Sequence, residues 1–154
     1  MVGFKEIGVN KDLCKAINEL GFTTPTEIQE ESIPFLLSNN NDLISLAQTG
    51  TGKTAAFGLP VIQKTYLENK VVQTVILCPT RELCIQICKD LEKYSKYISG
   101  LKILSVYGGT NIETQIKSLN KGVHIVVGTP GRTKDLIKRK VLKLELVDKV
   151  VLDE

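Results

Sequence analysis

The sequence predicts an α/β fold in which helices cover both faces of a parallel sheet. Short apolar runs bounded by turn residues alternate with amphipathic segments along most of the chain. These runs are continuously apolar, which is typical of strands buried on both faces. With 154 residues, 42% hydrophobic and 24% charged, the chain can bury one core, and no repeat or Pro/Gly/Ser linker interrupts it. We therefore expect one domain over residues 1–154.

The first element is predicted to be a helix that follows Asn10. Apolar residues recur at helical spacing at Leu13, Ile17 and Leu20. Asn10 is placed as an N-cap, and Gly21 lies where a left-handed residue ends a helix.

A second helix is predicted from the segment 24–27, Thr-Pro-Thr-Glu, which reads as a capping box with proline at the first helical position. Pro34 lies inside the predicted helix and should bend or break it. Gln29 lies on this helix.

Strands and helices then alternate. Strands are predicted at residues 43–47, 74–78, 102–107, 123–127 and 149–152, and helices from Lys53, over 81–97, over 112–119 and near 134–138. In open sheets of this kind, ligands bind at the carboxyl ends of the strands. The loops that follow the strands are therefore the candidate functional segments.

Composition excludes several classes of protein. The net charge of +3 is too small to indicate a polyanion partner by itself. The cysteines form no C-x-x-C pair and His124 is the one histidine, which supports neither a zinc site nor a disulfide scaffold; we expect buried free thiols in a reducing cytoplasm (Cys14, Cys78, Cys84, Cys88). No run approaches the roughly 18 apolar residues of a membrane span, so a soluble cytoplasmic protein is expected.

The segment Ala47-Gln48-Thr49-Gly50-Thr51-Gly52-Lys53-Thr54 predicts a phosphate-binding loop between a strand and a helix. Gly50 and Gly52 allow backbone N–H groups to turn toward phosphate oxygens, and the positive end of the next helix adds to the attraction. Lys53 would reach the β- and γ-phosphates, and the Thr54 hydroxyl would bind Mg²⁺. Ala47 stands where the generic pattern has its first glycine.

The chain ends with an apolar strand followed by two acids, Asp153 and Glu154. In phosphate-loop enzymes such a pair places one carboxylate near Mg²⁺ and another near the attacking water. A simple charged strand end is the alternative, which the phosphate-binding loop about 100 residues earlier disfavours.

Six motifs in order resemble those of DEAD-box RNA helicases of the bacterial type. They are Phe4 with Gly21-Phe22-x-x-Pro25-Thr26-x-Ile28-Gln29, the loop 47–54 as A-x-T-G-x-G-K-T, Pro79-Thr80-Arg81-Glu82-Leu83, Gly108-Gly109, Thr129-Pro130-Gly131-Arg132, and Asp153-Glu154 as the first half of D-E-A-D. Cys84 stands where the family pattern has alanine. The resemblance covers almost the whole chain and accounts for Ala47.

The resemblance implies an N-terminal RecA-like domain of an ATP-dependent RNA helicase, with ATP and Mg²⁺ as cofactors. It implies that Gln29 reads the adenine edge and that Phe4 packs near the nucleotide. Glu154 would orient the hydrolytic water, while Thr54 and Asp153 would hold Mg²⁺. An exposed polar residue and an apolar anchor are the structural alternatives for Gln29 and Phe4.

For RNA, the resemblance implies backbone contacts with little base specificity. The residues concerned follow three strands: Pro79, Thr80, Arg81, Gly108, Gly109, Thr129, Pro130, Gly131 and Arg132. The chain has no tryptophan and 5% aromatic residues, which disfavours a base-stacking platform. The basic residues from Arg132 to Lys143 are either a solvated helix face or an RNA-facing patch.

The chain is expected to be C-terminally incomplete, stopping within D-E-A-D and lacking the second RecA-like domain. The strand that carries the family's S-A-T element would lie between strands 43–47 and 149–152, so a gap in the sheet is expected. The isolated chain should be inactive or very weak as an enzyme. The alternatives are a nucleotide- or RNA-binding fragment without turnover, and an unrelated phosphate-loop ATPase or DNA helicase.

Overall fold

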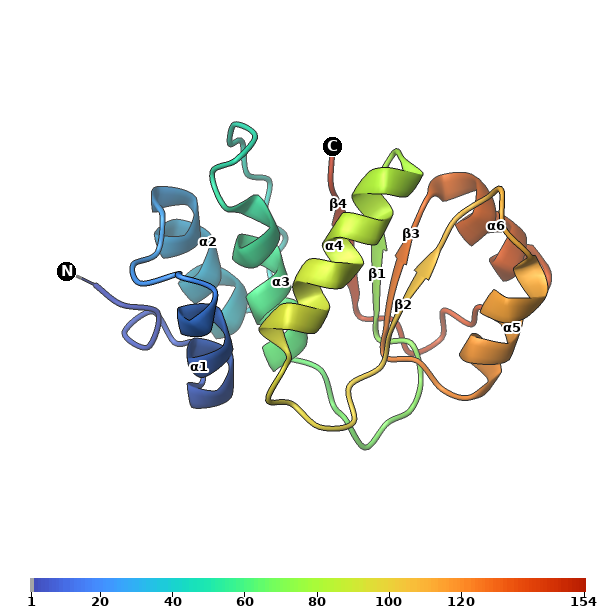
Figure 1. The fold of residues 1–154 in the computed structure, drawn as a ribbon, viewed down its shortest axis with the longest axis horizontal. Helices are drawn as coiled ribbons and strands as arrows, with labels where there is room; N and C mark the ends of the chain where they lie inside the picture. The colour runs from blue at the N-terminus through green and yellow to red at the C-terminus, as the bar shows by residue number, and fades with distance from the viewer. Residues whose placement is uncertain (1) are drawn as a thin grey trace. The chain divides into compact units, whose positions relative to one another are not determined.

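The computed structural model describes residues 2–154, which divide into two compact units. The first unit holds the chain up to Lys64 together with Asp90–Ser99, and the second holds Thr65–Lys89 with Gly100–Glu154. The first unit contains the helices α1 (Lys11–Glu19), α2 (Glu27–Ser38) and α3 (Lys53–Gln63). Helix α4 (Arg81–Tyr94), labelled in Figure 1, contributes residues to both units by its residue numbers.

Helix α1 forms as predicted. The Asn10 side chain accepts a hydrogen bond from the backbone N–H of Leu13 at 3.0 Å, which satisfies a donor that the first turn leaves unpaired. Leu13 and Ile17 are fully buried, and Gly21 has a φ of +87°. Both end signals of this helix are confirmed, and so is the periodicity at Leu13 and Ile17, whereas Leu20 is the C-cap and is 41% exposed.

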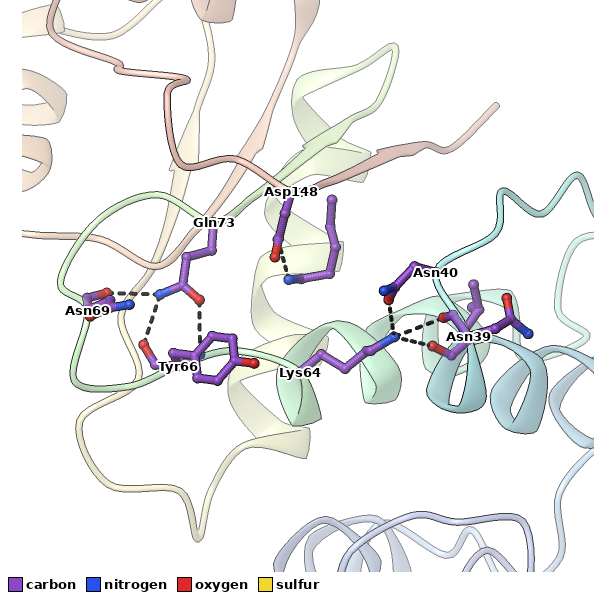
Figure 2. Close-up of polar contacts among 9 residues, drawn as sticks. Asn39, Asn40, Lys64, Tyr66, Asn69, Gln73 and Asp148 are labelled. Carbon is purple, nitrogen blue, oxygen red and sulfur yellow. Dashed lines mark hydrogen bonds and ion pairs between the residues drawn. The ribbon is translucent and has the colours of Figure 1, made fainter.

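Helix α2 differs from the prediction at its start and at Pro34. Thr26 is its N-cap, two residues after the position predicted, and the helix runs without a break through Pro34 to Ser38. Pro34 removes one backbone hydrogen bond of the helix. Burial of Ile33, the residue before Pro34, stabilises the helix on the N-terminal side of the proline. On the other side, the Lys64 Nζ donates to the carbonyl of Leu36 at 2.8 Å and thereby pairs an acceptor of the last turn (Figure 2).

The predicted strand at residues 43–47 is not formed. This segment is irregular, and Ile44 and Leu46 are 93% and 95% exposed. A strand exists only where a neighbouring strand supplies hydrogen-bond partners, and no strand among residues 2–154 pairs with this segment. An apolar run alone was therefore insufficient.

The second unit is built on a four-stranded parallel sheet in the order β2-β3-β1-β4. Its strands are β1 (Thr74–Leu77), β2 (Ile103–Val106), β3 (Ile125–Gly128) and β4 (Lys149–Leu152), each within two residues of the predicted bounds. In register, Val75 of β1 lies opposite Val126 of β3 and Val150 of β4. Within residues 2–154, β4 pairs only with β1, and its Val150 and Leu152 are 63% and 74% exposed.

Helices α5 (Ile112–Asn120) and α6 (Pro130–Lys138) pack against one face of this sheet (Figure 1). The core on that face joins buried residues of the strands to apolar residues of the two helices, including Val75, Val106, Val126, Ile116 and Leu136. Helix α6 begins at Pro130, earlier than predicted, because Thr129 is an N-cap and proline suits the first helical position.

The loop that leads into β1 is held by Gln73. Its Oε1 accepts from Tyr66 N at 2.9 Å, and its Nε2 donates to the carbonyls of Tyr66 and Asn69 at 2.8 and 2.9 Å (Figure 2). His124 is also buried, and its Nδ1 accepts from the backbone N–H of Lys102 at 3.0 Å. These contacts lie at the amino ends of the strands.

The four cysteines are free thiols, and Cys78, Cys84 and Cys88 are buried as expected while Cys14 is half-buried. Cys84, on α4, donates to the carbonyl of Val127 at 3.0 Å. Burial, and second the neighbouring Cys78, raise the pKa of the Cys84 thiol to about 12. Within residues 2–154, no helix has the length and apolar character needed to cross a membrane.

Candidate functional site

The predicted phosphate-binding loop lies in the first unit, between the irregular segment and α3. Gly50 and Gly52 have φ values of +80° and +89°, a conformation that residues with a Cβ rarely adopt. Inside the loop, the Thr51 hydroxyl donates to the carbonyl of Gln48 at 2.6 Å. Gly52 is the N-cap of α3, so Lys53 and Thr54 form the first residues of that helix. A helix N-terminus that presents its N–H groups in this way suits a phosphate.

Two side chains of the α2 N-terminus hold this loop. The Thr26 hydroxyl donates to the carbonyl of Thr51 at 2.8 Å, and the Gln29 Nε2 donates to the carbonyl of Gly52 at 3.1 Å. The Gln29 Oε1 accepts from the backbone N–H of Thr26 at 3.0 Å. Gln29 is 3% exposed, so its amide acts as a brace between α2 and the phosphate-binding loop.

Phe4 is also in the first unit and is 5% exposed. Its carbonyl accepts a hydrogen bond from Val9 N at 3.0 Å, which closes a turn before α1. The burial of its ring matches the apolar-anchor alternative.

The candidate RNA residues lie in the second unit, directly after three adjacent strands. Residues 79–81 follow β1, residues 108–109 follow β2, and residues 129–132 follow β3. Because the strands are parallel, their carboxyl ends meet at one edge of the sheet. The structure therefore brings together all the residues that the resemblance assigned to RNA.

Helix caps shape two of these loops. The Thr80 hydroxyl accepts from the backbone N–H of Leu83 at 3.2 Å at the start of α4, and Thr129 is the N-cap of α6. Gly109 has a φ of +81°, and a Cβ there would lie 3.8 Å from Arg81 Nη1. The Arg81 guanidinium lies 4.8 Å from the centre of the Tyr107 ring, a cation–π contact that joins the first loop to the second.

Arg132 is tied to the loop after β2. Its Nη1 donates to Gln115 Oε1 at 3.0 Å and its Nη2 donates to the Thr110 carbonyl at 3.1 Å. Gln115, on α5, is 7% exposed, and its Nε2 donates to the Tyr107 carbonyl at 3.2 Å and to Thr110 Oγ1 at 3.1 Å. The sequence prediction missed Gln115, Tyr107 and Thr110.

Asp153 and Glu154 follow β4 at the same edge of the sheet. The backbone N–H of Asp153 donates to the Leu77 carbonyl at 2.9 Å, which extends the β1–β4 ladder by one residue. Asp153 is half-buried, whereas Glu154 is exposed. The pKa of the Cys78 thiol is raised, first by burial, and the Asp153 charge acts in the same direction.

Comparison with known proteins shows which family the chain resembles. A family model described as DEAD/DEAH box helicase matches residues 26–154. The ATP-dependent RNA helicase CshA of Listeria monocytogenes is 51% identical over 154 residues, all of this chain and 29% of the relative. The DEAD-box ATP-dependent RNA helicase CshA of Streptococcus pneumoniae is 49% identical over 151 residues, 98% of this chain and 28% of the relative. The chain thus spans less than a third of these relatives' length.

Solved structures of DEAD-box proteins have the same fold as this chain. A DEAD box protein from the hyperthermophile Methanococcus jannaschii superposes with a TM-score of 0.94 at 42% identity, over 100% of this chain and 42% of that one. S. cerevisiae Dbp5 bound to RNA and ADP BeF3 superposes with a TM-score of 0.89 at 33% identity, over 99% of this chain and 38% of that one. The RecA-like α/β fold predicted from the sequence is confirmed.

Proposed function

The chain belongs to the DEAD/DEAH box helicase family, and we propose that it forms the first RecA-like domain of an enzyme that hydrolyses ATP to unwind RNA duplexes locally. The observation that supports this most directly is the contact between Gln29 and Gly52. It joins the family's glutamine to the phosphate-binding loop within one compact unit.

ATP binding is assigned to the first unit. Lys53 neutralises charge on the β- and γ-phosphates, and the backbone of the loop cradles them; the residues concerned are Ala47, Gln48, Thr49, Gly50, Thr51, Gly52, Lys53 and Thr54. Gln29 recognises the adenine edge, for which an amide offers one donor group and one acceptor. Each half of this amide already makes one hydrogen bond, and its second N–H and second lone pair remain for the base. Phe4 packs near the nucleotide.

The residue types fit Mg²⁺, which prefers hard oxygen ligands and retains several waters. Thr54 offers a hydroxyl and Asp153 a carboxylate. Bound Mg²⁺ would neutralise the charge that develops on the phosphates. Glu154 is the proposed base that orients the attacking water, a role for which its exposed carboxylate is accessible to solvent.

RNA binding is assigned to the sheet edge of the second unit. The loops after β1, β2 and β3 present helix N-termini, glycines and arginines together, and these groups suit phosphates and sugars. The proposed contact residues are Pro79, Thr80, Arg81, Gly108, Gly109, Thr129, Pro130, Gly131 and Arg132. Because few of these groups can reach base edges, binding should depend on salt and hardly on sequence.

The proposed mechanism needs the second RecA-like domain of the complete enzyme. ATP binding favours a closed state of the two domains that holds single-stranded RNA, and hydrolysis resets it. A nucleotide shifts such an equilibrium only through unequal affinity for the two states. We place the enzyme in the cytoplasm, where its free buried thiols are stable.

A binding module without turnover is the alternative from another class. ATP hydrolysis by the complete enzyme, with single-stranded RNA or with DNA of the same sequence, separates the possibilities. We expect stimulation by RNA and little by DNA. Equal stimulation would favour a DNA helicase or an unrelated ATPase, and ATP binding without hydrolysis would favour the binding module.

A further inference from the structure

Two loops of the proposed RNA edge, those after β2 and β3, are connected through one buried amide. The Gln115 Oε1 accepts a hydrogen bond from Arg132 Nη1, and the Gln115 Nε2 donates to the Tyr107 carbonyl and to Thr110 Oγ1. Arg81 in turn lies over the Tyr107 ring. The loop after β3 and the loop after β2 are therefore joined by hydrogen bonds, and the loop after β1 joins them by a cation–π contact.

We infer that Gln115 and Arg132 are positioning residues, and that they hold the RNA-contacting loops after β2 and β3 in one fixed arrangement. This inference rests on the proposed function. For Arg132 it replaces the contact role given above: the guanidinium holds the loops in place and does not itself bind an RNA phosphate.

The geometry of Arg132 supports the positioning role. A guanidinium binds phosphate best through a fork of two parallel N–H groups. In Arg132 both terminal nitrogens already donate within the protein, to Gln115 Oε1 at 3.0 Å and to the Thr110 carbonyl at 3.1 Å. The side chain is half-buried, which favours internal hydrogen bonds over a solvated contact.

The surroundings of Gln115 support it as well. The amide is 7% exposed and makes three hydrogen bonds, two through its nitrogen and one through its oxygen. Removal of this buried amide would leave the Tyr107 carbonyl and Arg132 without these hydrogen bonds, so both loops would be free to move. Ordered loops bind a strand more tightly because less conformational freedom is lost on binding.

The test measures RNA affinity of the complete enzyme, with a non-hydrolysable ATP analogue, over a series of salt concentrations. The variants are Gln115→Ala, Arg132→Ala, Arg132→Lys and the Gln115→Ala/Arg132→Ala double variant. We expect Gln115→Ala to weaken RNA binding roughly tenfold, as loss of hydrogen bonds to a charged group would. The slope of log affinity against log salt should be unchanged. Arg132→Lys should bind as weakly as Arg132→Ala because an ammonium cannot reproduce the fork.

The double variant should bind no more weakly than the weaker single variant, because both changes release the same loops. Gln73→Ala is the matched control. Gln73 is also buried, at 4% exposure, and also makes three side-chain hydrogen bonds, but at the opposite end of the strands (Figure 2). It should lower the melting temperature comparably while leaving RNA affinity at the wild-type value.

Three results would overturn the inference. The first is wild-type RNA affinity in Gln115→Ala, and the second is independent, multiplying effects of the two alanine changes. The third is a salt slope reduced by about 0.7 in Arg132→Ala and restored in Arg132→Lys, the signature of one lost phosphate contact on a single strand. Failure of the wild-type enzyme to bind RNA would instead refute the proposed function, and the inference with it.

Discussion

The side-chain nitrogen of Gln29 lies so close to Gly52 that a Cβ on this glycine would be 2.3 Å from it. The same nitrogen donates to the Gly52 carbonyl at 3.1 Å. Gly52 is therefore required both for its φ of +89° and for the space that Gln29 occupies.

Gly52→Ala should destabilise the protein and weaken ATP binding. The left-handed backbone alone costs about 1–2 kcal/mol in a residue with a Cβ, and displacement of Gln29 adds to this. Gly50→Ala is the matched control, because Gly50 has a φ of +80° but a Cβ there would meet none of the described residues within 4 Å. Thermal melting should show a larger loss for Gly52→Ala, and equal losses would argue against the close contact.

Gln29→Ala should weaken discrimination of ATP from GTP. An amide fitted to adenine is mismatched to guanine, so its removal affects the two nucleotides unequally. The variant also removes the hydrogen bonds to Thr26 N and to the Gly52 carbonyl, which should lower stability by about 1–3 kcal/mol. Dissociation constants for both nucleotides test this. An unchanged ratio of the two constants in a folded variant would mean that Gln29 only holds the loop and does not contact the base.

Replacement of Ile44 and Leu46 by lysine should reduce self-association of the isolated chain without lowering its melting temperature. Both side chains are more than nine-tenths exposed, and exposed apolar segments promote aggregation. Sedimentation and thermal melting of the double variant measure the two effects. A large loss of stability would show that these side chains are buried in solution.

Cys84 should make stability fall at high pH. Its pKa is about 12 in the folded protein against a reference value of 9.0, so the folded state keeps a proton that the unfolded state loses. The contribution of the Cys84 thiol to stability is complete below its reference pKa and is lost as the pH rises toward its pKa in the folded protein. Denaturant titrations across this window should show a steeper decline for wild type than for Cys84→Ala. An equal fall of stability with pH in the two proteins would contradict the raised pKa of Cys84.

The sheet of the second unit could be predicted because its strands are short apolar runs between turn signals, a pattern typical of strands in parallel sheets. In β4 the same pattern leaves Val150 and Leu152 exposed. The segment 43–47 has the same composition, but strand formation depends on a partner that a local pattern cannot specify. Likewise Pro34 is a helix breaker by local rules, and tertiary contacts around α2 overrode that preference.

The candidate phosphate-binding loop could be proposed from the sequence because its glycines and lysine lie together within residues 50–53. Gln115 was missed because its partners come from other loops. A signal was nevertheless present, since Ile112, Gln115, Ile116 and Leu119 follow the spacing i, i+3, i+4, i+7 of one helix face, and the three apolar residues pack against the core. A polar residue on a buried face must find hydrogen-bond partners.

The most direct test of the account is separation of a short RNA duplex by the complete enzyme, with Lys53→Ala as the comparison. Lys53 begins α3, and under the proposed function its loss removes charge that serves phosphate. We predict ATP-dependent strand separation by the wild type, and none by a Lys53→Ala variant with an unchanged melting temperature. Strand separation that proceeds equally without nucleotide, or equally in folded Lys53→Ala, would contradict it.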